Sequence, residues 1–329
     1  MMLRFGAFLA ASLALAAPLA AHDLLAGESA TDIPAIAGVV SGDAEWELVI
    51  ADFLIADGMA TLPDGGLLFA QEQSNTVKKI LPDGTQHIYL GDIAGAGAVS
   101  VDGEGNVYAV ERTCTDPGLN FPSCPELTRV VQIAPTRRLI ANAFADGTSL
   151  GRLNDLQADG HGGAWFTQGA LYHTTADGTV TTVAQVDAFT NGVTLSPDGK
   201  TLYVTNRTEI LAFDVGANGA TSNRRTFATL SSDTAGFGGD GMTVDAQGRL
   251  YVTGDAGVYV FAADGRELGI MPTPRRSITL AFAGPERDML YIGTMGAVGP
   301  DGKLWATPDG VRNVAMTIYR VPTLARGMR

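Results

Sequence analysis

Short apolar runs typical of β-strands recur along the chain, and a polar residue and a glycine precede each run at fixed distances. Four stretches align without a gap; each begins with Asp or Asn and has a glycine eight positions later. Each stretch leads into a short run of strand-favouring residues, which predicts a strand. The four stretches cover residues 57–65, 154–162, 191–199 and 240–248, and the runs that follow are Leu67–Ala70, Ala164–Thr167, Leu202–Thr205 and Leu250–Thr253.

Two weaker copies bring the number of repeats to six. They cover residues 97–105 and 279–285, and the strand-like runs Val107–Val110 and Leu290–Gly293 follow them. This spacing agrees with four-stranded propeller blades, which take roughly 40–50 residues each. The widest gap indicates an insertion within or after the second repeat. The six first positions, called lead positions below, are 57, 97, 154, 191, 240 and 279.

Further strand pairs lie between the lead stretches. Asp83-Gly84, Asp177-Gly178 and Asp264-Gly265 follow strand-like runs, and Asp-Gly between two such runs is a strong hairpin signal. Two hairpins per repeat give four strands, and no segment after residue 21 shows sustained helical periodicity. We therefore predict an all-β fold, a six-bladed β-propeller with four-stranded blades.

The two ends of the predicted propeller are both strand-like, at Trp46–Ile50 and at Met316–Val321. We expect them to share one composite closing blade, because closure of this kind leaves no long exposed sheet edge. The propeller then covers residues 45–329, and residues 22–44 form a poorly patterned lead-in.

Residues 1–21 have the pattern of a secretory signal peptide. Arg4 supplies the positive start, Phe5–Ala17 is an apolar run short for a membrane span, and Leu19–Ala21 provides a small-residue cleavage site. The alternative is an uncleaved anchor helix. We expect a periplasmic or secreted protein with no membrane insertion after signal cleavage, because no later run is long and apolar enough to span a bilayer.

Charge and cysteine content narrow the function classes. The chain has 22 basic and 35 acidic residues, so loss of Arg4 with the signal leaves a net charge of −14. Such a surface repels nucleic acid and anionic lipid, and we expect no nucleic-acid partner.

Cys114 and Cys124 flank a short loop, and in an oxidising compartment we expect a disulfide between them.

Oxygen-bearing side chains occupy four lead positions, at Asp57, Asn154, Asn191 and Asp240. If the repeats surround an axis, equivalent positions converge at one mouth of the central channel. Carboxylate and amide oxygens are ligands for a hard cation such as Ca²⁺, whereas zinc and copper favour histidine and cysteine. The alternative is that Asp and Asn only cap turns before strands. Recurrence at one offset in four repeats favours the metal site.

The later repeats resemble the SMP-30/gluconolactonase/luciferin-regenerating-enzyme-like (regucalcin-like) family, and diisopropylfluorophosphatase shares its four-ligand arrangement. The resemblance covers roughly residues 45–322. It departs at Asp57, where the family has a glutamate that binds calcium; the aspartate is shorter by one methylene group. The motifs that carry the resemblance are Arg152-Leu153-Asn154-Asp155, Asn191-Gly192-Val193 with Ser196–Tyr203, Asp240-Gly241-Met242 with Val244-Asp245, and Ala281–Pro285 with Leu290–Ile292.

The resemblance implies calcium-dependent hydrolysis of a lactone or small ester. Bound calcium would polarise the carbonyl for attack by water. Asp240 would assist that water as well as bind metal, and Arg152 and Asn154 would contact the substrate. For Arg152, a surface ion pair is the alternative.

Two other functions stay open at this stage. The same site could polarise a phosphoryl oxygen, as a phosphotriesterase does. The chain could instead be a non-catalytic propeller that binds a protein or peptide, with calcium purely structural. No Gly-x-Ser-x-Gly motif supports a serine esterase.

Overall fold

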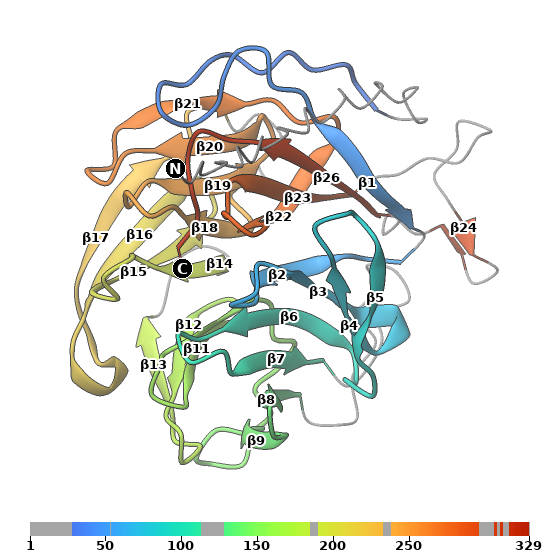
Figure 1. Cartoon of the computed structure of the whole chain (residues 1–329). Helices are drawn as coiled ribbons and strands as arrows, with labels where there is room; N and C mark the ends of the chain where they lie inside the picture. Colours follow the sequence, from blue (N-terminus) through green and yellow to red (C-terminus); the bar gives the residue numbers. More distant parts are fainter. Residues whose placement is uncertain are drawn as a thin grey trace, which may run out of the picture.

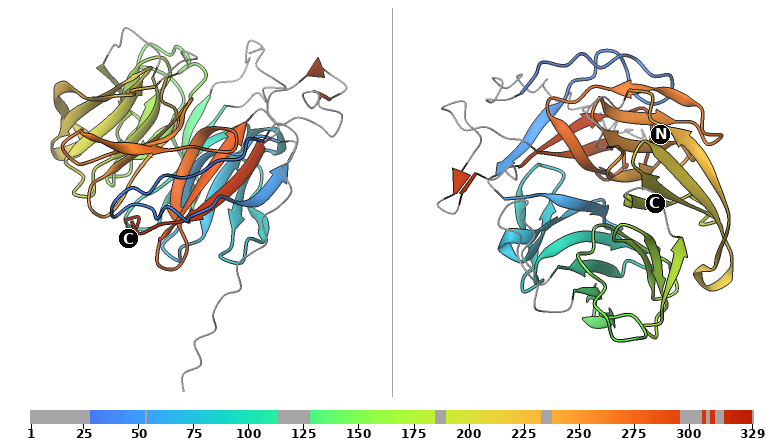
Figure 2. Two further views of the ribbon diagram at one scale, coloured as in Figure 1. Left: turned by 90° about the horizontal axis from the view of Figure 1, so that it is seen from above. Right: turned by 180° about the vertical axis from the view of Figure 1, so that it is seen from behind.

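The chain folds into six four-stranded antiparallel sheets around a central axis (Figures 1 and 2). The computed structural model describes residues 28–52, 54–112, 128–184, 190–232, 238–295, 306–307, 310–311 and 316–328. Within these ranges the only helical elements are two 3-10 turns, η1 (Glu72–Ser74) and η2 (Ala217–Gly219). The prediction of an all-β six-bladed propeller is therefore confirmed.

The first five blades are each built from four consecutive strands, and the first strand of each lies nearest the axis (Figure 1). Blade 1 comprises β2 (Asp57–Thr61), β3 (Leu67–Gln71), β4 (Thr76–Ile80) and β5 (Gln86–Leu90); blade 2 comprises β6 (Ala96–Val101), β7 (Val107–Glu111), β8 (Arg129–Ala134) and β9 (Arg138–Ala141). Blade 3 comprises β10 (Leu156–Ala158), β11 (Ala164–Thr167), β12 (Leu171–Thr174) and β13 (Val180–Ala184); blade 4 comprises β14 (Thr190–Leu195), β15 (Thr201–Asn206), β16 (Glu209–Val215) and β17 (Thr221–Thr229). Blade 5 comprises β18 (Met242–Val244), β19 (Leu250–Gly254), β20 (Gly257–Phe261) and β21 (Glu267–Met271).

The sixth blade joins the two ends of the propeller, as the sequence predicted. Its strands, in order from the axis, are β22 (Arg276–Ala283), β23 (Met289–Met295), β26 (Met316–Pro322) and β1 (Glu47–Asp52). The last two strands are antiparallel, with Glu47 opposite Arg320. The Arg320 guanidinium donates two hydrogen bonds of 2.8 Å to the Glu47 carboxylate. A separate small hairpin pairs β24 (Ala306–Thr307) with β25 (Gly310–Val311).

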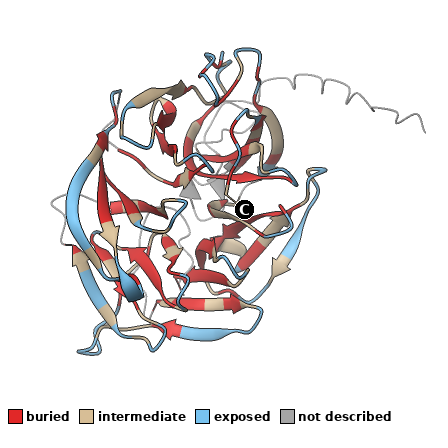
Figure 3. Ribbon diagram, turned by 60° about the vertical axis from the view of Figure 1, so that its left-hand side comes forward, coloured by how far each residue is buried: buried red, intermediate tan, exposed pale blue. Residues whose placement is uncertain are grey.

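Apolar side chains between neighbouring blades form the core. The second strand of a blade is covered on both faces, so its sequence is continuously apolar rather than alternating; every residue of β3, β7 and β19 is buried. The outermost strands are more exposed (Figure 3), for example at Gln86–Ile88 of β5. The apolar runs that follow the lead stretches are therefore these second strands, and the lead positions stand at the start of the innermost strands.

The described part of the lead-in packs on the propeller. Ile33, Ile36, Val39 and Val40 are buried in one core cluster with side chains of blades 5 and 6. The Trp46 indole donates a 2.8 Å hydrogen bond to a backbone carbonyl just beyond β21. This segment crosses the outer edge of blades 5 and 6, the dark blue trace in Figure 1.

The C-terminal segment returns to the middle of the ring, where Figures 1 and 3 place its end. Gly327 forms an isolated β-bridge with Asp245 of blade 5. The Ala246 N–H donates a 2.8 Å hydrogen bond to the Arg326 carbonyl. The C-terminal segment therefore lies at the channel mouth opposite the lead positions.

Two predictions fall outside the described residues. They are the signal peptide, residues 1–21, and the disulfide between Cys114 and Cys124. The insertion that holds both cysteines interrupts blade 2 between β7 and β8. In the part of the chain that is described, no helix has the length and apolar character needed to cross a membrane.

Candidate active site

In four of the six blades, the pairing of the innermost strand with the second strand is irregular near the lead position. In blade 1, Asp57 pairs with Ala70 and Met59 with Phe69, so Gly58 is an extra residue. Equivalent register shifts occur in blades 2, 4 and 6. A β-bulge of this kind re-aims a side chain, and bulges are enriched next to active sites.

The lead residues of blades 3 and 5 precede their strands by two positions but keep a hydrogen bond to the neighbouring strand. Asn154 N–H donates to the Thr167 carbonyl at 2.8 Å, and Asp240 N–H donates to the Thr253 carbonyl at 3.0 Å. Asn154 and Asp240 are therefore held by the same kind of backbone hydrogen bond to the second strand of their blade.

Close contacts between neighbouring blades bring the lead positions together. An added Cβ on Gly58 would lie 2.3 Å from Ala98 Cα, and one on Gly192 would lie 2.2 Å from the Asp240 carbonyl oxygen. Glycine is required after these lead residues because the backbone of the next blade occupies the space. Gly241 is equally close to blade 6, with an added Cβ 2.8 Å from the Ile278 carbonyl oxygen.

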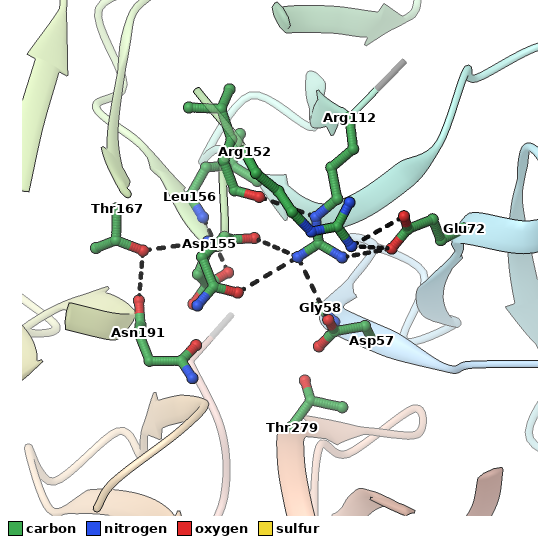
Figure 4. A network of polar contacts seen from close by, with 12 residues as sticks. Asp57, Gly58, Glu72, Arg112, Arg152, Asp155, Leu156, Thr167, Asn191 and Thr279 are labelled. Carbon is green, nitrogen blue, oxygen red and sulfur yellow. Dashed lines mark hydrogen bonds and ion pairs between the residues drawn. The ribbon is translucent and has the colours of Figure 1, made fainter. Parts of the chain in front are cut away.

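Polar contacts link two further pairs of neighbouring blades. Val193 N–H donates to Asp155 Oδ2 at 3.2 Å, which links blades 3 and 4. Met59 N–H donates to Thr279 Oγ1 at 3.1 Å, which links blades 1 and 6. In Figure 4, Asp57, Asn191 and Thr279 surround a common space at the channel mouth.

The structure thus brings the four predicted oxygen residues to one ring. Arg112 contacts two of them directly, because its Nη2 lies 3.6 Å from Asp57 Oδ2 and 3.3 Å from Asn154 Oδ1. Asn191 is linked to blade 3 through its carbonyl, which accepts a 2.6 Å hydrogen bond from the Thr167 hydroxyl. We call this set, Asp57, Asn154, Asn191 and Asp240, the oxygen ring.

Partly buried carboxylates repel one another around this ring. Burial raises the pKa of Asp57, Asp155 and Asp240. The negative charge of Asp57 raises the pKa of Asp155 further, to about 7, and also adds to the rise at Asp240. Arg112 acts in the opposite direction on all three. The site therefore favours additional positive charge.

A buried ion-pair network borders the ring (Figure 4), and its residues Glu72 and Arg112 were missed by the sequence analysis. Glu72 begins η1, directly after β3, and its side chain is 1% exposed. Its carboxylate accepts hydrogen bonds from Arg112 Nη1 at 2.8 Å and from Arg152 Nη2 at 2.9 Å. Asp155 was also missed as a ring carboxylate, although it directly follows Asn154 in the motif.

Arg152 lies beside the ring, as a substrate contact requires. Its side chain is 27% exposed, so part of the guanidinium faces solvent while Glu72 fixes the rest. The ion pair expected as the alternative for Arg152 exists, but its partner is a buried carboxylate rather than a surface one.

The channel continues from the ring toward the opposite mouth. A cavity of about 430 Å³ is lined by Gly58, Asp155 and Gly241 near the ring, and by Arg287 and Met328 at the far end. Its walls are the innermost strands, so the ring stands at one end of a continuous space.

The donor set fits a hard divalent cation. When ionised, Asp57, Glu72, Asp155 and Asp240 carry four negative charges, whereas Arg112 and Arg152 carry two positive ones. Among the described residues, no group of three or more His, Cys, Asp or Glu side chains has the arrangement to hold a metal by itself. A bound cation would therefore also need the amide oxygens of Asn154 and Asn191 as ligands, and all-oxygen ligation suits calcium better than zinc or copper.

Fold and site together define a six-bladed propeller with a carboxylate-rich oxygen ring at one channel mouth. The chain belongs to the SMP-30/Gluconolactonase/LRE-like family, whose sequence model matches residues 92–296. The resemblance found in the sequence motifs is thereby confirmed.

Two similar proteins of known name are lactonases. Pentonolactonase XacC of Haloferax volcanii is 32% identical over 189 residues, which span 54% of this chain and 64% of that protein, just under two-thirds. Gluconolactonase of Zymomonas mobilis is 22% identical over 300 residues, which span 79% of this chain and 81% of that protein.

Solved structures share the fold. A gluconolactonase from Xanthomonas campestris superposes with a TM-score of 0.68 at 23% identity, covering 93% of this chain and 99% of its own. Regucalcin from Agrobacterium tumefaciens, described as a calcium-binding protein, gives a TM-score of 0.62 at 19% identity, covering 86% and 95%.

Proposed function

We propose that this chain is an exported, metal-dependent hydrolase of a lactone or small ester, with Ca²⁺ as the cation. The observation that carries the proposal is the oxygen ring, in which partly buried carboxylates and two amides lie at the mouth of the channel. Membership of a family with lactonase members supports the reaction class. Export rests on the N-terminal pattern of residues 1–21.

Each ring residue has a role that follows from its position. Asp57, Asn154, Asn191 and Asp240 would hold the cation. When bound, the cation supplies a Lewis acid that polarises the substrate carbonyl and stabilises negative charge on its oxygen. Hydrolysis adds water across the ester C–O bond. In a lactone, the carbonyl carbon gains the hydroxyl, the ring C–O bond breaks, the released ring oxygen takes up the proton and a hydroxy acid leaves.

Asp240 is the candidate that orients the attacking water and accepts its proton. Its carboxylate belongs to the oxygen ring, where a water that attacks the polarised carbonyl would lie. Arg152 would contact the substrate, because Glu72 fixes its guanidinium beside the ring while leaving it partly exposed.

A panel of lactones, small esters and phosphotriesters, assayed with and without chelator, tests the proposal. We expect lactone turnover that a chelator abolishes and that added Ca²⁺ restores. Turnover insensitive to chelator would reject the metal mechanism, turnover of phosphotriesters alone would change the reaction class, and an inactive protein that still binds Ca²⁺ would favour the non-catalytic propeller.

Asp240→Asn separates catalysis from metal binding. The amide retains an oxygen donor but cannot accept the water proton, so we expect turnover to fall by at least about a hundredfold, a typical contribution of general-base catalysis. Calcium binding is followed in parallel by calorimetry. Retention of both calcium binding and full turnover would remove Asp240 from the role of base.

A further inference from the structure

Blade 2 contributes no side chain to the oxygen ring at its lead position. Gly97 occupies that position, and the Arg112 guanidinium fills the space beside it. An added Cβ on Gly97 would lie 2.4 Å from Arg112 Nε and 2.6 Å from Arg112 Cζ. Because Gly97 has no side chain, the Arg112 guanidinium can occupy this space.

Arg112 is held firmly in this position. Its side chain is 5% exposed. Nε donates to the Leu153 carbonyl at 2.8 Å, Nη1 donates to Glu72 Oε2 at 2.8 Å, and Nη2 donates to the Asn154 carbonyl at 3.1 Å. Glu72 lies in blade 1 and Asn154 in blade 3, so the guanidinium bridges both neighbours of its own blade.

The same guanidinium reaches two residues of the oxygen ring. Nη2 also donates to Asn154 Oδ1 at 3.3 Å, and it lies 3.6 Å from Asp57 Oδ2. A cation bound by these two oxygens would stand within a few ångströms of a fixed positive charge. Like charges at such distances repel strongly in a buried site, where solvent screening is weak.

We propose that Arg112 is a built-in cation of the ring, which compensates part of its negative charge in the metal-free protein and limits the affinity for the divalent metal. This inference rests on the proposed metal site. Glu72 is a positioning residue in this arrangement, because it holds the guanidinium against the ring. Gly97 makes the arrangement possible, since it leaves the blade-2 position open.

A different role for Arg112 predicts the opposite result. Residues that hydrogen-bond to metal ligands often orient them, and loss of such a residue typically weakens metal binding 10–100-fold. If Arg112 acts as a competing charge, its neutralisation strengthens metal binding instead. The direction of the change therefore decides between the two roles.

Metal binding by Arg112→Gln, measured by calorimetry on chelator-treated protein, tests the proposal. We expect Ca²⁺ to bind at least about tenfold more tightly than to the wild type, equivalent to about 1.4 kcal/mol. The melting temperature of the metal-free variant should fall, and saturating Ca²⁺ should reduce that difference. Unchanged or weaker Ca²⁺ binding by this variant would overturn the proposal.

Two further variants make the test independent of a folding defect. Arg112→Lys keeps the charge, and we expect its Ca²⁺ affinity to stay within about threefold of the wild type, a small fraction of the change expected for the neutral variant. In the double variant Glu72→Gln with Arg112→Gln, one negative and one positive charge are lost together. We expect its affinity to return toward the wild-type value, and an affinity as high as that of Arg112→Gln would overturn the charge argument.

These outcomes separate the inference from the proposed function. A wild type that binds Ca²⁺ but hydrolyses no lactone would refute the enzymatic proposal and leave the role of Arg112 intact. If neither the wild type nor Arg112→Gln binds Ca²⁺, Mg²⁺ or Mn²⁺, both the metal site and this inference fail.

Discussion

A buried carboxylate stays charged only when positive charge or hydrogen-bond donors lie close to it. At the scale of single residues, Glu72 and Asp240 differ in the charges that surround them. Glu72 is fully buried yet paired with two guanidiniums. Asp240 faces the charges of Asp57 and Asp155, and its pKa rises well above the usual value because of burial and that repulsion.

The charge of Asp57 should matter for metal binding despite the shorter side chain. Asp57→Asn keeps an oxygen donor and removes one negative charge from the ring. We expect Ca²⁺ affinity to fall at least about tenfold, or about 1.4 kcal/mol, as measured by calorimetry. Asp64→Asn is the control, because Asp64 is 61% exposed and pairs with Lys79 outside the ring. Equal affinities for the two variants would exclude Asp57 as a ligand.

Asp159 offers a pH-dependent test away from the ring. Burial acts to raise its pKa, but hydrogen bonds from His173 and from two backbone N–H groups outweigh burial and hold the pKa below the usual 3.8. His173 Nε2 lies 2.9 Å from Asp159 Oδ2. A lowered folded-state pKa gives stability that is complete above pH 3.8 and is lost as the pH falls through the folded-state pKa.

Asp159→Asn should therefore lower the free energy of unfolding at pH 7 by about 1–3 kcal/mol, the usual cost of a broken charge-assisted hydrogen bond. The difference from wild type should shrink when urea denaturation is repeated below pH 3.8. Asp177→Asn, in an exposed hairpin turn of the same blade, is the control with an effect below about 1 kcal/mol. If the difference in the free energy of unfolding between Asp159→Asn and the wild type did not change with pH, the lowered pKa of Asp159 would not be its source.

At the scale of elements, the bulge at the start of the innermost strand joins fold to site. In blade 1 the extra residue is Gly58, directly after Asp57. The glycines that follow Asp57, Asn191 and Asp240 let the next blade approach. Gly192 shows the constraint most clearly, since its Cα faces the Asp240 backbone with no room for a methyl group.

Gly192→Ala should separate blades 4 and 5 at the ring. We expect the free energy of unfolding to fall by about 1–3 kcal/mol, a typical cost of overpacking, and Ca²⁺ affinity to fall with it. Gly103→Ala is the matched control, because an added Cβ there meets nothing within 4 Å. Denaturation and calorimetry on both variants measure the contrast, and similar results for the two would show that the contact is not constraining.

At the scale of the whole molecule, the lead-in and the composite blade hold the ring of sheets together. Ile36 is 5% exposed in the cluster that joins the lead-in to blades 5 and 6. Ile36→Ala should cost about 2–5 kcal/mol, as buried large-to-small substitutions do. Leu324→Ala, at a residue 64% exposed, should change stability by less than about 0.5 kcal/mol. A neutral Ile36→Ala in urea denaturation would show that the lead-in is dispensable.

The sequence predicted the blades because strands, Asp-Gly turns and their spacing are local properties that repeat. The four oxygen positions were predictable for the same reason, since each stands eight residues before a glycine. The strand predicted at Trp46–Ile50 was also placed correctly, since β1 (Glu47–Asp52) belongs to the closing blade.

The remaining parts depend on contacts between distant segments. Glu72 and Arg112 are 40 residues apart and meet only because neighbouring blades adjoin. Gly97 was the signal in the sequence for the buried Arg112, because a lead position without a side chain leaves room for another side chain. The lead-in has apolar residues without a period, so only its packing against side chains of blades 5 and 6 explains why Ile33 and Val39 are buried.

The outermost strand of the closing blade comes from the beginning of the described chain, and its partner β26 comes from the end. During synthesis, the four residues of the oxygen ring are therefore made before β26, the strand that pairs with β1 and closes the propeller. A truncated product that lacks β26 would retain Asp57, Asn154, Asn191 and Asp240 but would leave β1 without its neighbour and the circle open. Pairing of β26 with β1 is thus the contact that closes the propeller.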